Sequence, residues 1–153
     1  MTTHPEEMMT VPEIIRYWGY PVEVHKAVTA DGYIVTMHRI PYGRSTYQNY
    51  CGISLKDKQC QPFPGTGCLE GRRPVIFLQH GLLCSSAHWV LNFPHQSAGF
   101  FFADQGFDVW MGNFRGNVYS KEHVRLSCLS PEFWQFRNSE IILLKARMSI
   151  ERS

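Results

Sequence analysis

Two stretches in which apolar and polar residues alternate, 23–28 and 33–40, open the regular part of the chain. Successive side chains of a β-strand point to opposite faces of a sheet, so this alternation is typical of strands with one buried face. Between them lies Thr29-Ala-Asp-Gly32, and an Asp-Gly pair is a strong signal for a hairpin turn. The pattern therefore predicts an antiparallel hairpin.

Two later stretches, 75–79 and 107–111, are apolar almost throughout and do not alternate. Short continuous apolar runs are typical of buried strands in parallel sheets. A helix is predicted between them at 97–105, with Ser97 as its N-cap and Gly106 as its stop. The side chains expected to pack from this helix are Phe100, Phe101 and Ala103. Strand, helix and strand form a βαβ unit, which implies a parallel pair joined by a right-handed crossover.

Two shorter helices are marked by their starting residues. Thr10-Val-Pro-Glu13 has the spacing of a capping box, and Gly19 is expected to end the helix that follows. Ser130-Pro-Glu-Phe-Trp134 places Ser at an N-cap and Pro in the first turn, which predicts a second, short helix start. The segment 44–73 has no periodic pattern and is expected to be an insertion or a functional flap.

Composition limits the partners of the chain. A content of 44% hydrophobic and 18% charged residues suffices for a folded core within one domain. The net charge of +2 is too small for a nucleic-acid-binding surface, so we expect no nucleic-acid partner. No apolar run is long enough to span a membrane. The first residues lack the basic start and apolar stretch of a signal peptide, so the literal interpretation is a cytoplasmic protein.

Three of the five cysteines, Cys51, Cys60 and Cys68, fall within the insertion 44–73. Their spacings match no pattern typical of a zinc site, so we expect neither a metal nor a cofactor. A metal-bound module built on this segment is therefore the least favoured interpretation. A surface loop closed by one disulfide is the alternative if the protein is exported, and the pairing of the three cysteines is left open.

Six short motifs occur in order along the chain and are together specific, although each is weak alone. They are Ile15-Arg-Tyr-Trp-Gly-Tyr-Pro21, Thr29-Ala-Asp-Gly-Tyr-Ile34, Arg39-Ile-Pro-Tyr-Gly43, Phe77-Leu-Gln-His-Gly-Leu-Leu83, Ala103-Asp-Gln-Gly-Phe-Asp-Val-Trp110 and Gly112-Asn-Phe-Arg-Gly-Asn117. In these motifs the chain resembles the acid lipase family, which includes gastric lipase and lysosomal acid lipase. The resemblance covers 7–136, with the cysteine-containing segment as an insertion.

The resemblance implies an α/β-hydrolase fold and the hydrolysis of lipid carboxylic esters, such as triacylglycerols or cholesteryl esters, by a Ser-Asp-His triad. The predicted hairpin would supply the first two strands, 75–79 the third, 97–105 the first helix and 107–111 the fourth strand. A lipid ester and transient contact with a lipid interface are the partners that the resemblance implies. Members of the family are lysosomal or secreted, so the location of this protein is left open.

His80-Gly81-Leu82 follows the third predicted strand and matches the family motif for part of an oxyanion hole. By this resemblance the donor is the backbone N–H of Leu82, supported by His80 and Gly81. Gly81 is expected to permit a tight turn, and His80 to act as a structural hydrogen-bonding residue. The leucines at this point suit a mouth that accepts acyl chains.

Three further features have both a structural and a functional interpretation. Cys84 follows the same loop and is a candidate nucleophile, but no motif places a base beside it, so a buried or neutral thiol is favoured. Arg115 is expected to form a structural ion pair or hydrogen bond. Five aromatic residues could line an acyl pocket, although core packing is favoured for most: Trp89, Phe93, Phe100, Phe101 and Phe102.

The G-x-S-x-G pattern of the nucleophile elbow does not occur, and no residue can be assigned to the triad. Similarity to the family ends near Phe136, so we interpret 1–9 as an extension, 10–136 as the N-terminal part of a lipase domain and 137–153 as a divergent tail. We expect a truncated α/β-hydrolase that is inactive alone and supplies only the oxyanion loop. The alternative is a non-catalytic isoform that binds lipid or a partner, or interferes with a full-length sibling.

In the α/β-hydrolase fold the third strand lies between the fourth and the fifth. Without the fifth, 75–79 would be an apolar edge with unpaired N–H and C=O groups, which is a template for aggregation. Each large side chain left uncovered costs about 1.5–3 kcal/mol, against a domain stability of about 5–15 kcal/mol. The chain alone is therefore expected to be marginal or insoluble.

Overall fold

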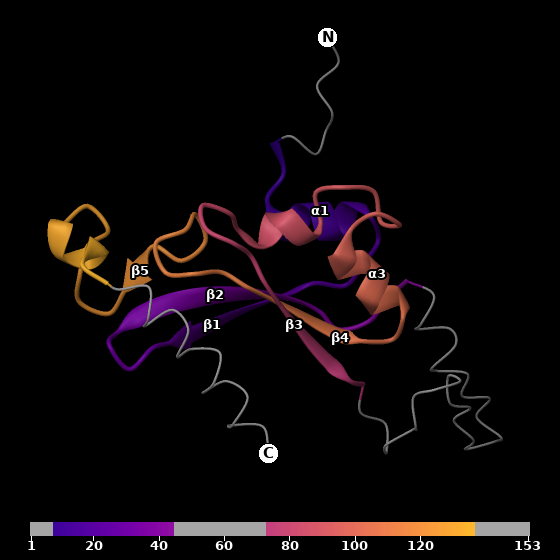
Figure 1. The fold of residues 1–153 in the computed structure, drawn as a ribbon, viewed down its shortest axis with the longest axis horizontal. Helices are drawn as coiled ribbons and strands as arrows, with labels where there is room; N and C mark the ends of the chain where they lie inside the picture. The colour runs from indigo at the N-terminus through magenta and orange to yellow at the C-terminus, as the bar shows by residue number, and fades with distance from the viewer. Residues whose placement is uncertain (1–7, 45–72, 137–153) are drawn as a thin grey trace, which may run out of the picture.

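A computed structural model describes residues 8–44 and 73–136 of the chain, and these form a mixed α/β unit built on a five-stranded sheet (Figure 1). The sheet has the strand order β1-β2-β4-β3, and β5 pairs with β2. The elements are α1 (Val11–Tyr17), β1 (Glu23–Val28), β2 (Tyr33–Ile40), β3 (Val75–Gln79), η2 (Ser86–Trp89), α3 (Ala98–Asp104), β4 (Asp108–Gly112), β5 (Glu122–His123) and η3 (Pro131–Trp134).

The predicted hairpin and the predicted parallel pair are both confirmed. β1 and β2 are antiparallel, with Glu23 opposite Arg39 and Val28 opposite Ile34. β3 and β4 are parallel, and β4 is in turn antiparallel to β2. The last strand of the pair was expected at 107–111 and lies one residue later, at Asp108–Gly112.

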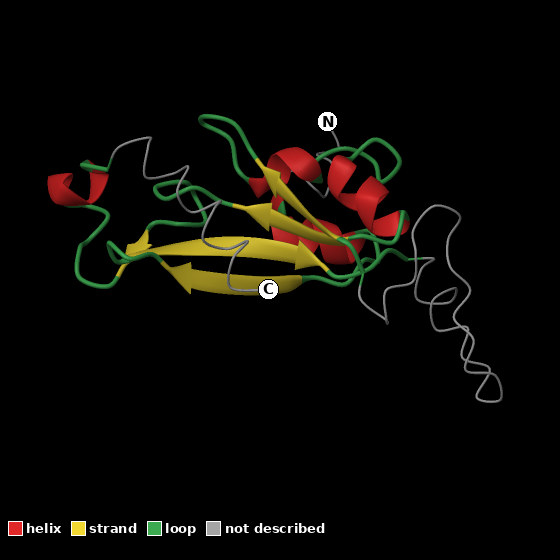
Figure 2. Ribbon diagram, turned by 60° about the horizontal axis from the view of Figure 1, so that its bottom comes forward, coloured by secondary structure: helices red, strands yellow, loops and turns green. Residues whose placement is uncertain are grey.

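The helices α1 and α3 lie on one face of the sheet, and the core lies between the two layers (Figure 2). α1 contributes Ile15 and α3 contributes Phe100, both with no exposed surface, and Met111 of β4 is equally buried. The Tyr20 ring stacks on Phe100 with 4.5 Å between the ring centroids. The packing of the helices against the sheet holds β3 and β4 in place. The carboxyl ends of these two strands carry the loops described below.

α1 begins and ends as its sequence predicts. The Glu13 carboxylate accepts hydrogen bonds from the N–H of Thr10, at 2.7 Å, and from its hydroxyl, at 2.6 Å, which completes the capping box. The helix ends before Gly19, whose φ of 77° is accessible to glycine at little cost. The helix is thereby fixed at both ends over the sheet.

The predicted helix at 97–105 is α3, with two differences from expectation. Ser97 occupies the N-cap position, but its hydroxyl bonds the backbone of Asn92 instead of a helix N–H. Phe100 and Ala103 are fully buried as predicted, whereas the prediction for Phe101 was wrong because half of that side chain is exposed. The successive residues 100 and 101 point about 100° apart around the helix, so one faces the sheet and the other does not.

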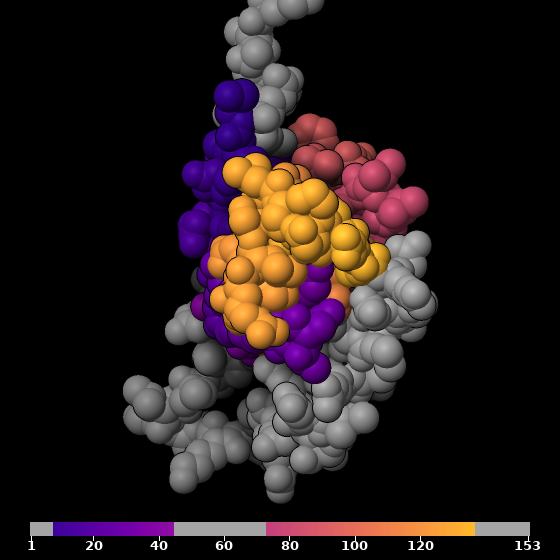
Figure 3. Space-filling model, turned by 90° about the vertical axis from the view of Figure 1, so that its left-hand side faces the viewer, coloured from indigo at the N-terminus to yellow at the C-terminus, as the bar shows by residue number. Residues whose placement is uncertain are grey.

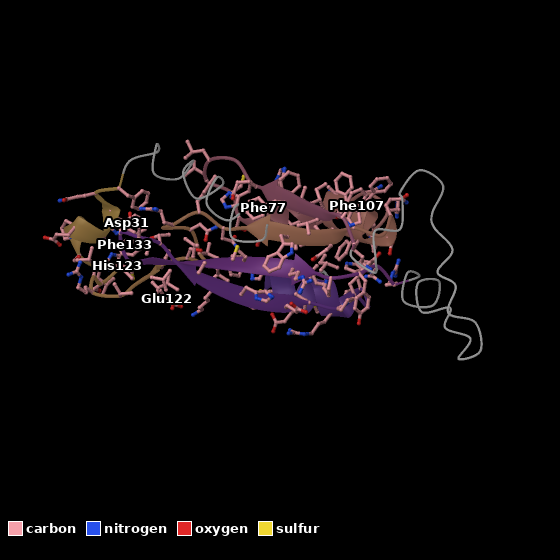
Figure 4. All side chains as sticks on the ribbon, turned by 90° about the horizontal axis from the view of Figure 1, so that it is seen from below. Asp31, Phe77, Phe107, Glu122, His123 and Phe133 are labelled. Atoms are coloured by element: carbon pink, nitrogen blue, oxygen red, sulfur yellow. The ribbon has the colours of Figure 1, made fainter. Side chains whose placement is uncertain are left out.

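β3 differs most from its sequence-based description. It was expected to be a buried strand, but only Leu78 is buried, while Val75 and Phe77 remain 55% and 39% exposed. The cause is its position at the edge of the sheet: within the described residues, β4 is its only neighbour. Phe77 lies on the face that carries no helix, as Figure 4 shows from below.

The chain after β4 returns across the end of the hairpin, where Figure 3 shows it as the orange and yellow surface. β5 adds two residues to the edge of β2 near the turn, an element that no sequence pattern indicated. The short helix expected at Ser130 is the single 3₁₀ turn η3. The Tyr33 hydroxyl donates to the Phe133 carbonyl and ties this turn to β2.

The ends of the segment that separates β2 from β3 are held beside each other. The Arg73 guanidinium donates to the Pro41 carbonyl over 2.8 Å and lies 5.1 Å from the centre of the Tyr42 ring. On the other side, the N–H of Arg44 donates to the Asp104 carboxylate of α3 over 3.1 Å. Both ends are therefore anchored to the described unit.

Several predictions lie wholly or largely outside the described residues. These are the extension at 1–9, the insertion at 44–73 with Cys51, Cys60 and Cys68, and the divergent tail at 137–153. Within 8–44 and 73–136, no helix is both long and apolar enough to cross a bilayer.

Candidate functional site

The loop that follows β3 is the candidate site. It lies at the carboxyl ends of the parallel strands β3 and β4, next to the loop that follows β4 (Figure 1). The side chains of Leu82 and Leu83 are 82% and 97% exposed there. Ligands of open α/β sheets bind at this end of the strands, so both the position and the exposed apolar surface suit a substrate mouth.

The backbone N–H of Leu82 has no hydrogen-bond acceptor among the described residues. The carbonyl of the same peptide, that of Gly81, accepts from His80 Nδ1 over 2.8 Å and from the N–H of Cys84 over 3.3 Å. A backbone N–H that has no acceptor within the described part of the chain is the chemical feature that an oxyanion requires.

His80 is buried and connects the two loops. Its Nε2 accepts from the N–H of Phe114 and from the side-chain amide of Asn117, each at 3.2 Å. Burial lowers the pKa of His80, although its bond to the Gly81 carbonyl acts in the opposite sense. The imidazole is a neutral hydrogen-bonding link, with no free nitrogen to act as a base.

The tight turn in this loop lies at Leu83, not at Gly81. Leu83 has a φ of 62°, in the left-handed region that bulky residues rarely occupy, while Gly81 is not in that region. A methyl group added to Gly81 would meet no atom within 4 Å. The expectation that Gly81 supplies the turn was therefore wrong. A non-glycine residue held at positive φ costs about 1–3 kcal/mol and is typical of functional loops.

A buried polar network supports the loop from below, and sequence reasoning missed it. The Ser86 hydroxyl and His38 Nδ1 lie 2.8 Å apart, and the N–H of Ser86 donates to Asn113 over 2.9 Å. The Asn113 amide in turn donates to the Thr36 carbonyl over 3.1 Å. These residues come from η2, β2 and the loop after β4, so the network joins three segments, and it reaches His80 through the Asn113–Asn117 contact.

The Ser86–His38 pair has the composition of a nucleophile and its base, but its burial excludes that role. Ser86 has no exposed surface and His38 only 1%, so no substrate reaches either side chain. Desolvation lowers the pKa of His38 to about 4, which keeps the ring neutral. The pair is a structural contact. No motif could have revealed it, because its two residues lie on separate elements.

Cys84 and Arg115 have different outcomes. A buried or neutral thiol was favoured for Cys84; the thiol is free and exposed, so the burial half of that prediction was wrong. The structural role of Arg115 is confirmed, because its buried guanidinium pairs with Asp31 and lies 4.4 Å from the centre of the Tyr33 ring. Burial tends to raise the pKa of Asp31, but hydrogen bonds from Thr29 and Arg115 outweigh it and the pKa is lowered. Asp31 and its neighbours occupy the far end of the sheet, away from Phe77 (Figure 4).

The aromatic residues that could line an acyl pocket divide into two groups. Phe100 is fully buried, and Trp89 and Phe102 are partly buried against the same core, so core packing is confirmed for these three. Phe93 and Phe101 are each half exposed. In the described ranges, no three His, Cys, Asp or Glu side chains converge in the manner of a metal site.

Comparison with known proteins gives a consistent picture. Residues 11–93 match the family described as a partial α/β-hydrolase lipase region. The chain is 45% identical over 138 residues to a gastric triacylglycerol lipase of Bos taurus, covering 90% of this chain and 30% of that protein. It is 47% identical over 139 residues to the lipase lipl-5 of Caenorhabditis elegans, covering 90% and 29%.

A third similar protein is a lysosomal acid lipase/cholesteryl ester hydrolase of Homo sapiens. It is 44% identical over 137 residues, which are 90% of this chain and 29% of that protein. The chain thus spans about 30% of the length of the curated relatives it matches.

Proposed function

Because this chain belongs to the acid lipase family of α/β-hydrolase lipases, we propose that it supplies the oxyanion loop of a lipid carboxylic-ester hydrolase. The observation that carries the proposal is the N–H of Leu82, which has no acceptor among the described residues and lies next to two exposed leucines, Leu82 and Leu83, after the carboxyl end of β3. The substrate class follows from the relatives, which are named as triacylglycerol and cholesteryl ester lipases. The exposed leucines also suit transient contact with a lipid surface.

The strand order supports a finer assignment. In this proposal β1 to β4 are the first four strands of the α/β-hydrolase sheet, α3 is its first helix, and 10–136 is the N-terminal part of the lipase domain. The order β1-β2-β4-β3, with a parallel pair at one edge, is compatible with such a sheet. The loop after β3 then occupies the position from which this fold takes one oxyanion donor.

The chemistry assigned to the loop is electrostatic. When a nucleophile attacks an ester carbonyl, negative charge develops on the carbonyl oxygen, and a fixed N–H stabilises it without reorganisation. The 153 residues contain no G-x-S-x-G pattern, so the proposal assigns the nucleophile and its partners to residues outside this sequence. On this basis the 153-residue chain alone is expected to hydrolyse a short-chain nitrophenyl ester no faster than buffer.

Leu82→Pro tests the donor directly. The substitution is made in the native form of the protein, as it occurs in its source organism. Proline removes the N–H, and Leu82 is not at positive φ, so the sign of φ that proline requires is already present. We expect kcat to fall about 10²–10³-fold, the usual effect of losing one oxyanion donor. Leu82→Ala is the matched control, because it shortens the side chain and keeps the N–H. Equal activities of the two variants would contradict the assignment.

The open edge of β3 favours a second candidate function. Val75 and Phe77 are exposed residues of β3 itself, and the outer side of this strand has no partner among the described residues. A non-catalytic protein that binds a partner strand, or interferes with a longer sibling, would use this edge. The ester assay distinguishes the two candidate functions. If the native protein hydrolyses no ester and stably binds a partner through β3, the non-catalytic function is favoured.

A further inference from the structure

We propose that Asn117 is a positioning residue, which acts through His80 to fix the direction of the Leu82 N–H. This inference rests on the proposed function, since it concerns the donor assigned there. It arises from the hydrogen bonds between the loop after β3 and the loop after β4, which run from Asn117 to His80 and on to Gly81.

The first step concerns one peptide plane. The carbonyl held by His80 belongs to Gly81, and the N–H proposed as donor belongs to Leu82, so both are parts of the same peptide unit. This unit is trans, because the described chain contains no cis peptide bond. In a trans peptide the C=O and N–H point in opposite directions. The His80 side chain, by holding the carbonyl, therefore directs the N–H away from the imidazole ring.

The second step concerns the proton on His80. A carbonyl oxygen can only accept, so the 2.8 Å contact with Gly81 requires the proton on Nδ1. The Phe114 N–H can only donate, so Nε2 must carry the lone pair. With the proton moved to Nε2, both contacts would be lost. The hydrogen bond that holds the Gly81–Leu82 peptide thus depends on a single tautomer of the His80 ring.

The third step is the orientation of Asn117. Its side-chain oxygen accepts from the N–H of Tyr119 over 2.9 Å, which places the amide nitrogen toward His80. That nitrogen donates to His80 Nε2 over 3.2 Å and to the Asn113 side-chain oxygen over 2.9 Å. Asn117 therefore adds a second donor at Nε2 and favours the tautomer that holds the peptide.

Aspartate at position 117 would reverse this preference with almost no change in size. Its carboxylate can accept from Tyr119 but cannot donate to His80, and it would attract a proton to Nε2. Asn92→Asp is the matched control, because Asn92 is exposed on another loop and the chemical change is the same.

The experiment uses the native form of the protein, as it occurs in its source organism, labelled with ¹⁵N at histidine and leucine. NMR then reports the two ring nitrogens of His80 and the Leu82 amide. We expect His80 protonated at Nδ1 in the wild type. Asn117→Asp should shift His80 toward protonation at Nε2 and displace the Leu82 amide resonance, whereas Asn92→Asp should change neither. A wild-type His80 protonated at Nε2 would overturn the inference, even if the variant failed to fold.

Kinetics on a soluble nitrophenyl ester complete the test. A misdirected donor weakens binding of the transition state and not of the substrate, so Asn117→Asp should lower kcat at least about tenfold with little change in KM. A changed His80 with an unmoved Leu82 amide and unchanged kcat would refute the positioning role. If the Leu82 amide moves but the wild-type protein hydrolyses no ester, the link between the loops stands and the proposed function fails.

Discussion

At the scale of single residues, the most consequential contact is the buried pair of His38 and Ser86. A neutral histidine with 1% exposure sits against the Ser86 hydroxyl at 2.8 Å beneath the candidate loop. Such a group favours the folded state only while it is uncharged. The pair therefore makes the support of the loop sensitive to acid.

The expected pH dependence follows from the lowered pKa of His38. In the unfolded chain histidine titrates near 6.5, whereas in the folded protein its pKa is about 4. Between these values the unfolded state binds the extra proton, so stability is full above pH 6.5 and is lost as the pH falls toward 4. The difference corresponds to about 3 kcal/mol.

His38→Gln removes this titration. Urea unfolding at pH 7 and at pH 4.5 should show that the wild type loses more stability on acidification than the variant does. His95→Gln, at an exposed histidine, serves as the control and should follow the wild type. An identical pH dependence in wild type and His38→Gln would contradict the assignment.

At the scale of elements, the segment after β2 and the end of α3 approach closely at Gly43. A methyl group there would lie 2.5 Å from the Asp104 Cα and 2.6 Å from the Ala103 carbonyl oxygen. Since backbone atoms cannot move aside as a flexible side chain can, only glycine fits between the strand end and the helix. Glycine at this position therefore permits the close approach of the two segments.

Gly43→Ala is expected to lower the free energy of unfolding by about 1–3 kcal/mol, the usual effect of overpacking. Gly81→Ala is the control, because its added methyl group meets nothing within 4 Å, and it should change stability by less than about 0.5 kcal/mol. Denaturant midpoints of the two variants provide the comparison. Equal midpoints would show that the close approach is dispensable.

The elements that sequence predicted well are those with a local physical signal. Alternation and the Asp-Gly turn placed β1 and β2 at their observed bounds, and the capping box placed α1. β5 has only two residues and no pattern, so nothing local could indicate it. The apolar run of β3 predicted a strand correctly but not its burial, because burial depends on neighbours that the run itself does not specify.

The candidate site was predictable only in part, for a related reason. The loop 80–82 could be placed after a strand from sequence, and the resemblance assigned its donor. The residues that hold it, Asn113 and Asn117, share no motif with His80 and meet it only through the pairing of β3 with β4. The left-handed turn at Leu83 was equally hidden, because sequence favours glycine for such a conformation.

At the scale of the whole molecule, the exposed edge of β3 is the feature from which we expect association between chains. An exposed strand edge flanked by Val75 and Phe77 is a template for pairing with another chain. We expect residues 1–153, expressed alone, to associate as concentration rises in sedimentation measurements. The double substitution Val75→Lys and Phe77→Lys places charge on this edge and should shift the distribution toward monomer.

Val118→Lys provides the control for the added charge, because Val118 is 69% exposed but lies in the loop after β4. It should leave the association unchanged. A soluble wild-type monomer with a cooperative thermal transition would contradict the expectation for the edge.

The hydrogen bond between Arg73 and Pro41, which holds the two ends of the segment 45–72 beside each other, has a consequence for protein engineering. Since the two ends of the segment 45–72 are anchored beside each other, the free-energy cost of lengthening that segment rises only as the logarithm of its length, about 0.6 kcal/mol per doubling. The contact between Arg73 and Pro41 lies at the amino-terminal side of β3, whereas the Leu82 loop follows the carboxyl end of this strand. A fluorescent or affinity module could therefore be spliced between Arg44 and Arg73 as a reporter, with the carboxyl end of the sheet, where the candidate loop lies, left untouched.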